Sequence, residues 1–385
     1  MLRRIGLGLL ACLALLPCPA RPCSICNGLQ GQSLRQDAAD AKLVLYGTLT
    51  NPRLTAPNEG AGGTTDLVIE SVIKSDPFLA NQKVVALPRY VPVDPKSPPK
   101  FLIFCDVYKG KDGKERLDPY RGVPVKSDAV VKYLQGSLAL DAKDRTRVLL
   151  YYFDYLDHRD PDISGDAFLE FAKASDQEIG QVAPKLSAAR LRGWLQDPNT
   201  PAARLGLYAF LLGACGTDKD AELLLARLVA PDERAANAID GLLGGYVQLR
   251  PRDGWDLAQA ILRDDKKPFT QRFAVLRTLR MFHASKPAET RRDVLGGLGV
   301  AVAQGDLADM AVEDLRRWQM WDLTRDVLAQ FGKPSHAAPI VRGAIVRYAL
   351  CCPDGEAKRF IDALRRQNPD LVKDVEESLQ FEKQR

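Results

Sequence analysis

The segment VLLYYFDYLDHRDPDISGDAFLEFA (residues 148–172) sets the pattern for most of the chain that follows it. An apolar run ends at Asp160-Pro161, and a second amphipathic run, which includes Ala167, Phe168 and Leu169, begins directly afterwards. Proline disfavours the continuation of a helix, so the Asp-Pro pair separates two helices. The segment therefore predicts a helix hairpin.

The same break returns at a regular spacing, at Asp197-Pro198, Pro231-Asp232, Lys267-Pro268 and Lys333-Pro334. The first spacing is 37 residues and the last is 66, or two units of 33. A period in this range with two helices per unit is typical of an α-solenoid. We expect a superhelix of stacked hairpins over residues 143–385, with Ser187 and Thr217 among its N-caps.

The first 20 residues have the build of a secretory signal peptide. Arg3 and Arg4 precede an apolar run over residues 5–16, and Ala20 offers a cleavage site. A lipoprotein signal that ends at Cys12 is the alternative, and it would give a lipid-anchored protein. We expect an exported protein, periplasmic or secreted, without a membrane span, because no later run approaches the length of a membrane helix.

Residues 21–142 predict a smaller domain of a different class. Four runs rich in branched and aromatic residues are separated by turns that contain Gly and Pro, at residues 42–49, 65–74, 83–87 and 100–107. Their spacing predicts a small, mostly antiparallel barrel or sandwich. Helices are expected at residues 32–40 and, with Ser127 as N-cap, at residues 127–138. The predicted fold class is α+β, a small β-barrel followed by a helical superhelix.

The helical part resembles HEAT repeats over residues 145–385. The resemblance rests on the Asp-Pro breaks and on small residues in the helices that follow them, namely Ala202, Ala203, Gly206, Ala209, Ala235, Ala236, Ala238, Gly343 and Ala344. It implies a ladder of stacked Asp and Arg side chains, with Arg204 or Arg234 as its arginines. Asp166 stands at the arginine position of the first repeat.

The N-terminal part, over residues 23–140, resembles the netrin-module and metalloproteinase-inhibitor type of oligonucleotide/oligosaccharide-binding (OB) barrel. The motifs are Cys23-Ser-Ile-Cys26, ADAKLVLYGTL, TTDLVIESVIKSDPFLANQKVVAL and FLIFCDV. The resemblance implies a disulfide between Cys23 or Cys26 and Cys105. The inhibitors carry Cys-x-Cys at a free N-terminus, whereas this chain has Cys-x-x-Cys preceded by Arg21-Pro22.

Other candidate chemistry is sparse. An acidic cluster in the first repeat, with His158 among its members, is expected to cap helices and face solvent; it comprises Asp154, Asp157, Asp160, Asp162, Asp166 and Glu170. Calcium binding is the alternative. No hydrolase, zinc-protease or phosphate-loop motif occurs in the sequence. We predict no catalytic, cofactor-binding or metal residues.

The expected function is non-catalytic binding of another protein or peptide by the solenoid face, with the barrel as a second recognition module. The net charge of +5 is spread in both signs along the helices, so the sequence does not predict nucleic-acid binding. Two alternatives are kept. One is an inhibitor-like module for an exported metalloprotease, and the other is a thiol-disulfide protein that uses Cys23 and Cys26.

Overall fold

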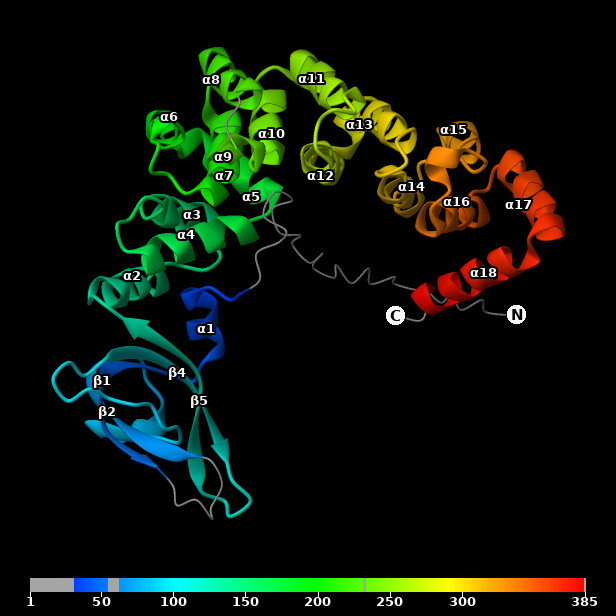
Figure 1. The fold of residues 1–385 in the computed structure, drawn as a ribbon. Coiled ribbons are helices and arrows are strands. Elements are labelled where there is room, and N and C mark those ends of the chain that lie inside the picture. Colours follow the sequence, from blue (N-terminus) through cyan, green and yellow to red (C-terminus); the bar gives the residue numbers. More distant parts are fainter. Residues whose placement is uncertain (1–30, 55–61, 231–232, 384–385) are drawn as a thin grey trace, which may run out of the picture.

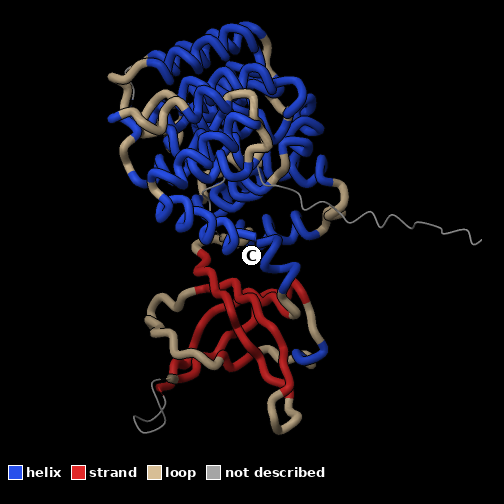
Figure 2. The backbone as a smooth tube through the Cα atoms, turned by 90° about the vertical axis from the view of Figure 1, so that its right-hand side faces the viewer, coloured by secondary structure: helices blue, strands red, loops and turns tan. Residues whose placement is uncertain are grey.

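The computed structural model describes residues 31–54, 62–230 and 233–383. A five-stranded antiparallel sheet is followed by a long helical region that curves away from it (Figure 1). The view turned by 90° places the strands at one end of the molecule and nearly all helices at the other (Figure 2). The α+β layout predicted from the sequence is confirmed.

The sheet has the strand order β3-β2-β1-β4-β5, and every neighbouring pair is antiparallel. Its strands are β1 (Leu43–Leu54), β2 (Gly63–Lys74), β3 (Val84–Leu87), β4 (Lys100–Lys109) and β5 (Glu115–Val125). The four predicted runs are β1 to β4. The fifth strand, β5, was not expected, and it lies at an edge of the sheet.

The antiparallel sheet predicted from the sequence is present, but it does not close into a barrel, because it is open between its edge strands β3 and β5. β3 has only four residues and therefore offers a short edge. β5 contains Pro119 and Pro124, which have no backbone N–H to donate to a further strand.

The central strand β1 and its neighbour β4 bury side chains on both of their faces. Leu43 and Leu45 of β1 pack in the sheet's own core, beside Leu67 and Leu79. The alternate residue Val44 packs in the core that continues into the helices. A strand with period two can serve both cores because successive side chains point to opposite faces. The sheet and the helical region therefore share a continuous apolar junction.

Helix α1 (Leu34–Asp40) and the 3-10 turn η2 (Pro77–Leu79) belong to the sheet region. The remaining helices follow β5 without interruption by strands. They are α2 (Ala129–Leu138), α3 (Arg145–Phe153), α4 (Pro161–Lys173), α5 (Asp176–Val182), α6 (Ala188–Gln196), α7 (Ala202–Cys215), α8 (Asp218–Val229), α9 (Glu233–Ala236), α10 (Ile239–Leu249), α11 (Pro251–Arg263), α12 (Phe269–Ser285), α13 (Pro287–Val302), α14 (Ala308–Arg317), α15 (Thr324–Leu328), α16 (Pro339–Cys351), α17 (Gly355–Gln367) and α18 (Pro369–Lys383).

These helices form antiparallel hairpins that are stacked along an arc (Figure 1). An outer row contains α8, α11, α13, α15 and α17, and an inner row contains α7, α10, α12, α14, α16 and α18. Each hairpin covers the apolar stripe of its neighbour, as expected for a solenoid. The inner row lines the concave side of the arc.

The predicted helix signals fall at helix starts. The Asp160 carboxylate accepts a hydrogen bond from the Asp162 backbone N–H at 3.0 Å, with Pro161 in the first turn of α4. Ser187 caps α6, and Thr217 forms a capping box at the start of α8. Ser127 accepts from the N–H of Ala129, although α2 begins two residues after it.

The small residues predicted at close helix contacts have that role between α7 and α10. A Cβ atom on Gly241 would overlap the carbonyl of Gly206, and a Cβ on Gly245 would overlap the carbonyl of Ala209. The two helices thus meet backbone to backbone, which only glycine permits at these positions.

Candidate functional site: the inner row of helices

Helix α12 presents a stripe of aromatic and cationic side chains on the inner row. Phe273, Arg277 and Arg280 are partly exposed and lie four and three residues apart, which places them on one face. The guanidinium carbons of Arg277 and Arg280 lie 5.2 and 5.7 Å from the centre of the Phe273 ring. Phe269, which is 42% exposed, stacks parallel to Phe273. This geometry gives attractive cation–π contacts.

Each of the two arginines also reaches a neighbouring inner helix. Arg277 Nε donates to Asp240 Oδ2 of α10 at 2.9 Å, and Arg280 Nε donates to Asp314 Oδ2 of α14 at 2.7 Å. Both aspartates are buried. The guanidiniums therefore satisfy buried carboxylates and still leave part of their surface in contact with solvent.

The pairing continues toward the C-terminus. Arg316 of α14 donates to Glu313 at 2.8 Å and to Glu382 of α18 at 2.8 Å, and Arg347 of α16 donates to Glu313. We call the whole set the inner-row ladder; it comprises Asp240, Arg277, Arg280, Glu313, Asp314, Arg316, Arg347 and Glu382. It connects α10, α12, α14, α16 and α18.

The ladder alters the protonation of its acids in two ways. Burial raises the pKa of Asp314 above its ordinary value, and the Arg280 guanidinium offsets part of that rise. At the more exposed end, the hydrogen bond from Arg316 holds the pKa of Glu382 below its ordinary value. The Arg280 guanidinium therefore favours the ionised form of Asp314 and opposes the effect of burial.

A pocket of about 580 Å³ lies at the C-terminal end of the ladder, between α14, α16 and α18. Its lining residues are Glu313, Arg316, Arg317, Arg347, Ser378, Phe381 and Glu382. Arg317 is exposed and makes no ion pair within the described part of the chain. Phe381 is 71% exposed. The pocket thus combines an available guanidinium with an apolar ring.

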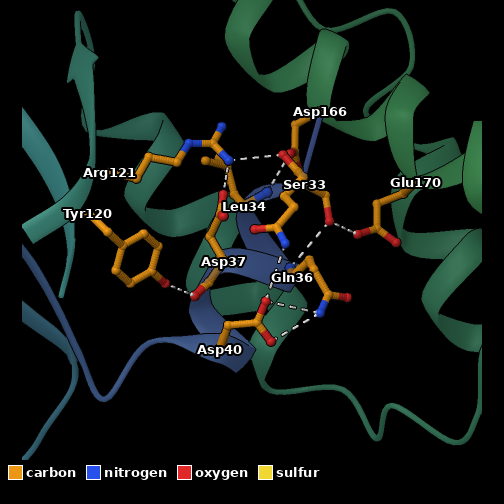
Figure 3. A network of polar contacts seen from close by, with 10 residues as sticks. Ser33, Leu34, Gln36, Asp37, Asp40, Tyr120, Arg121, Asp166 and Glu170 are labelled. Carbon is orange, nitrogen blue, oxygen red and sulfur yellow. Dashed lines mark hydrogen bonds and ion pairs between the residues drawn. The ribbon is translucent and has the colours of Figure 1, made fainter. Parts of the chain in front are cut away.

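A second polar cluster joins the sheet to the first hairpin (Figure 3). Asp166 of α4 accepts hydrogen bonds from the Leu34 backbone N–H and the Tyr133 hydroxyl, each at 2.7 Å. Ser33 donates to Glu170, which lies one helical turn further along α4. On the sheet side, Arg121 of β5 pairs with Asp37 of α1. The network anchors α1 and β5 to the helical region.

The expectation that the first-repeat acids face solvent is therefore wrong for Asp166 and Glu170, because both are buried. Burial raises the pKa of Asp166 to about 6. Asp160 is a helix cap, whereas Asp154 and Asp157 pair with Arg190 at 2.7 and 3.1 Å. Among the described residues, no three His, Cys, Asp or Glu side chains converge as metal ligands would.

Of the three cysteines in the predicted disulfide, only Cys105 lies within the described residues. Cys23 and Cys26 lie outside the described residues. Cys105 on β4 is buried in the sheet's own core and forms no disulfide with another described cysteine. Burial raises the pKa of its thiol to about 12. A thiol of this kind is a poor nucleophile at neutral pH.

The two arginines implied by the HEAT resemblance each donate a hydrogen bond to a backbone carbonyl. Arg204 donates to the carbonyl of Leu156 at 2.8 Å and to the Ser164 hydroxyl at 2.9 Å. Arg234 donates to the carbonyl of Thr200. Both reach back to the preceding hairpin.

Acid–arginine pairs with Arg277 and Arg280 lie on later helices and form part of the inner-row ladder. Sequence reasoning missed it, although Arg280 and Asp314 stand 34 residues apart, as do Arg347 and Glu313. That separation is close to the repeat length, so an acid and an arginine about one repeat apart were the signal in the sequence that could have predicted these pairs.

Comparison with known proteins assigns no family. No family model matches the chain, and neither the curated proteins nor the solved structures contain a match. Within the described ranges, no helix is both long and apolar enough to cross a bilayer.

Proposed function

We propose that this protein is an exported, non-catalytic binding protein whose concave inner row holds another protein or a peptide. The observation that carries the proposal is the inner-row ladder. It holds partly exposed arginines at fixed positions along successive helices, and two of these arginines cover Phe273 of α12. Solenoids use such extended concave surfaces to bind partners.

The chemistry of this surface supports a protein partner. Arginine and aromatic side chains are enriched at the energetic centres of protein interfaces. Here Phe269 and Phe273 stack on each other, and Arg277 and Arg280 cover Phe273. Because the arginines are held by Asp240 and Asp314, little side-chain freedom remains to be lost on binding.

The charge pattern argues against nucleic acid. Each arginine of the ladder is accompanied by a carboxylate, and the whole chain carries a net charge of only +5. A nucleic-acid surface requires a basic face that is not neutralised in this way.

We further propose that the helical region is of the HEAT type and that the sheet region is of the netrin or OB type. The stacked hairpins and the backbone contact between α7 and α10 support the first assignment. A five-stranded sheet wrapped around its own small core supports the second, since the OB fold is a partly open five-stranded structure. Export rests on the signal-like residues 1–20.

The test is affinity capture from the native envelope fraction by the purified full chain. Phe269→Asp replaces the exposed aromatic ring of α12 with a carboxylate. Val229→Asp is the control, because it introduces the same carboxylate at a 66% exposed apolar residue at the end of the outer helix α8. We expect the partner to be retained by the wild type and by Val229→Asp and lost with Phe269→Asp. Equal retention by both variants would contradict the proposal.

The metalloprotease-inhibitor hypothesis has a separate test. That chemistry requires a free amine at Cys23, so sequencing the N-terminus of the mature protein decides it. A mature chain that begins at Arg21 excludes the inhibitor mechanism.

A further inference from the structure

We propose that the pocket between α14, α16 and α18 binds a carboxylate side chain of an acidic, partly apolar peptide segment in the partner. The inference rests on the proposed function, because it specifies the chemistry of the partner at one end of the same surface. Its centre is Arg317, the last residue of α14.

Arg317 differs from the other arginines of the pocket in forming no ion pair with a described residue, although its positive charge acts on the nearby Asp314 and Glu382. Arg316 is held between Glu313 and Glu382, and Arg347 donates to Glu313. Three guanidiniums against two carboxylates leave one positive charge in the pocket. An incoming carboxylate would supply the missing partner, and Arg can receive it through two parallel N–H bonds.

The surroundings of Arg317 are already fixed. Glu313 and Glu382 are held by Arg316, which is itself mostly buried, with a 10% exposed side chain. These acids are therefore engaged elsewhere and do not need to be displaced before a ligand enters. A site that is organised in advance binds with less loss of entropy.

The exposed ring of Phe381 indicates that the ligand carries an apolar side chain beside its carboxylate. The Phe381 ring is 71% exposed on α18 and lines the same pocket as Arg317. An exposed phenylalanine beside a guanidinium offers a contact for an aromatic or aliphatic side chain next to the acidic one. The Ser378 hydroxyl provides a further polar contact in the lining.

A peptide carboxylate fits this pocket better than a nucleic-acid backbone. One unneutralised guanidinium matches a single carboxylate, whereas successive phosphates would also meet Glu313 and Glu382. Like charges brought together at an interface oppose binding. The pocket therefore favours an isolated acid flanked by apolar residues.

The test uses the full chain and a labelled peptide of alternating Glu and Phe, acetylated and amidated at its ends, in a fluorescence anisotropy titration. The same peptide with Gln in place of Glu, and a short single-stranded DNA, are the comparison probes. Arg317→Glu removes the proposed contact. The matched control is Arg292→Glu, which makes the same charge change at an exposed residue of α13 outside the pocket.

We expect the Glu-Phe peptide to bind the wild type and Arg292→Glu with equal affinity, and to bind Arg317→Glu about tenfold or more weakly. Unchanged thermal unfolding of the variants confirms that they are folded. The inference is overturned if the wild type does not bind the peptide, if the Gln-Phe peptide binds equally well, if the DNA binds more tightly, or if Arg317→Glu has no effect. The capture experiment with Phe269→Asp tests partner binding by the inner row independently of this pocket. A negative result in the peptide titration would therefore overturn this inference without contradicting the proposed function.

Discussion

Arg280 donates its Nε–H to Asp314 across the space between α12 and α14, and the two residues are 34 positions apart in the chain. The Asp314 side chain is only 10% exposed, whereas that of Arg280 is 34% exposed. The bond therefore joins two neighbouring hairpins through a buried acid whose partner remains accessible from the solvent. It provides structural support within the surface proposed to bind the partner.

Replacing Arg280 with alanine should destabilise the protein by about 2 kcal/mol, because the buried Asp314 loses its charged hydrogen-bond donor. The free energy of unfolding in urea measures this loss. Arg292→Ala, at an exposed residue of α13, is the control and should change the free energy by less than about 0.5 kcal/mol. Equal effects of the two variants would show that the bond contributes little.

Asp166 should make stability depend on pH in an unusual direction. Burial raises its pKa from 3.8 to about 6, so the folded state binds the proton more tightly than the unfolded state. The contribution of this proton is present at low pH and is lost as the pH rises from about 4 to about 6. The groups that face Asp166 are the Leu34 N–H and the Tyr133 hydroxyl, with Glu170 and Arg121 nearby.

Asp166→Asn removes this titration and can still accept a hydrogen bond from Leu34. The free energy of unfolding of the variant, relative to that of the wild type, should therefore increase by about 2 kcal/mol between pH 4 and pH 7. Urea unfolding of both proteins at a series of pH values measures the difference. A constant difference across this range would disprove the proposed titration.

Gly241→Ala should destabilise the contact between α7 and α10. The added methyl group would overlap the carbonyl of Gly206, so the helices would have to separate, at a cost of about 1 to 3 kcal/mol. Gly193→Ala in α6 is the matched control, because a Cβ there meets no atom within 4 Å. Greater helix propensity should make that variant more stable by about 0.5 to 1 kcal/mol. Thermal unfolding compares them, and a loss at Gly193 equal to that at Gly241 would argue against backbone contact.

The helical region was predictable because its signals are local. Asp160-Pro161 and the caps at Ser187 and Thr217 act within one turn, and the sequence displays them directly. β5 escaped prediction because Pro119, Pro124 and its charged residues are atypical of a strand and are tolerated only at an edge. The sheet stays open at the edge formed by β5, and the amino-acid composition of β5 alone does not predict that edge.

The candidate site was harder to predict because its contacts join separate hairpins. The bonds from Arg277 to Asp240 and from Arg280 to Asp314 depend on how neighbouring helices are stacked. Likewise, Asp166 belongs to an acidic cluster in the sequence but is covered by α1 in the structure. Charge type was visible in the sequence, whereas burial was decided by tertiary packing.

Cysteine labelling tests the thiol chemistry and the predicted disulfide together. In the native protein we expect Cys351, which is exposed, to react with iodoacetamide, and Cys105 to remain unmodified because it is buried and its thiol pKa is about 12. In denaturant without a reductant, Cys105 should still resist labelling if it is joined to Cys23 or Cys26. Mass spectrometry identifies the modified peptides, and labelling of Cys105 at that stage would exclude the disulfide.

Site-specific photo-crosslinking in the native compartment is the most direct measurement of binding by the concave surface. A photoreactive phenylalanine analogue is placed at Phe269 on the inner helix α12 and, for comparison, at Val229 on the outer helix α8. We predict a discrete crosslinked partner from position 269 and none from position 229. Crosslinks that form only at position 229, or equally at both positions, would contradict recognition by the inner row.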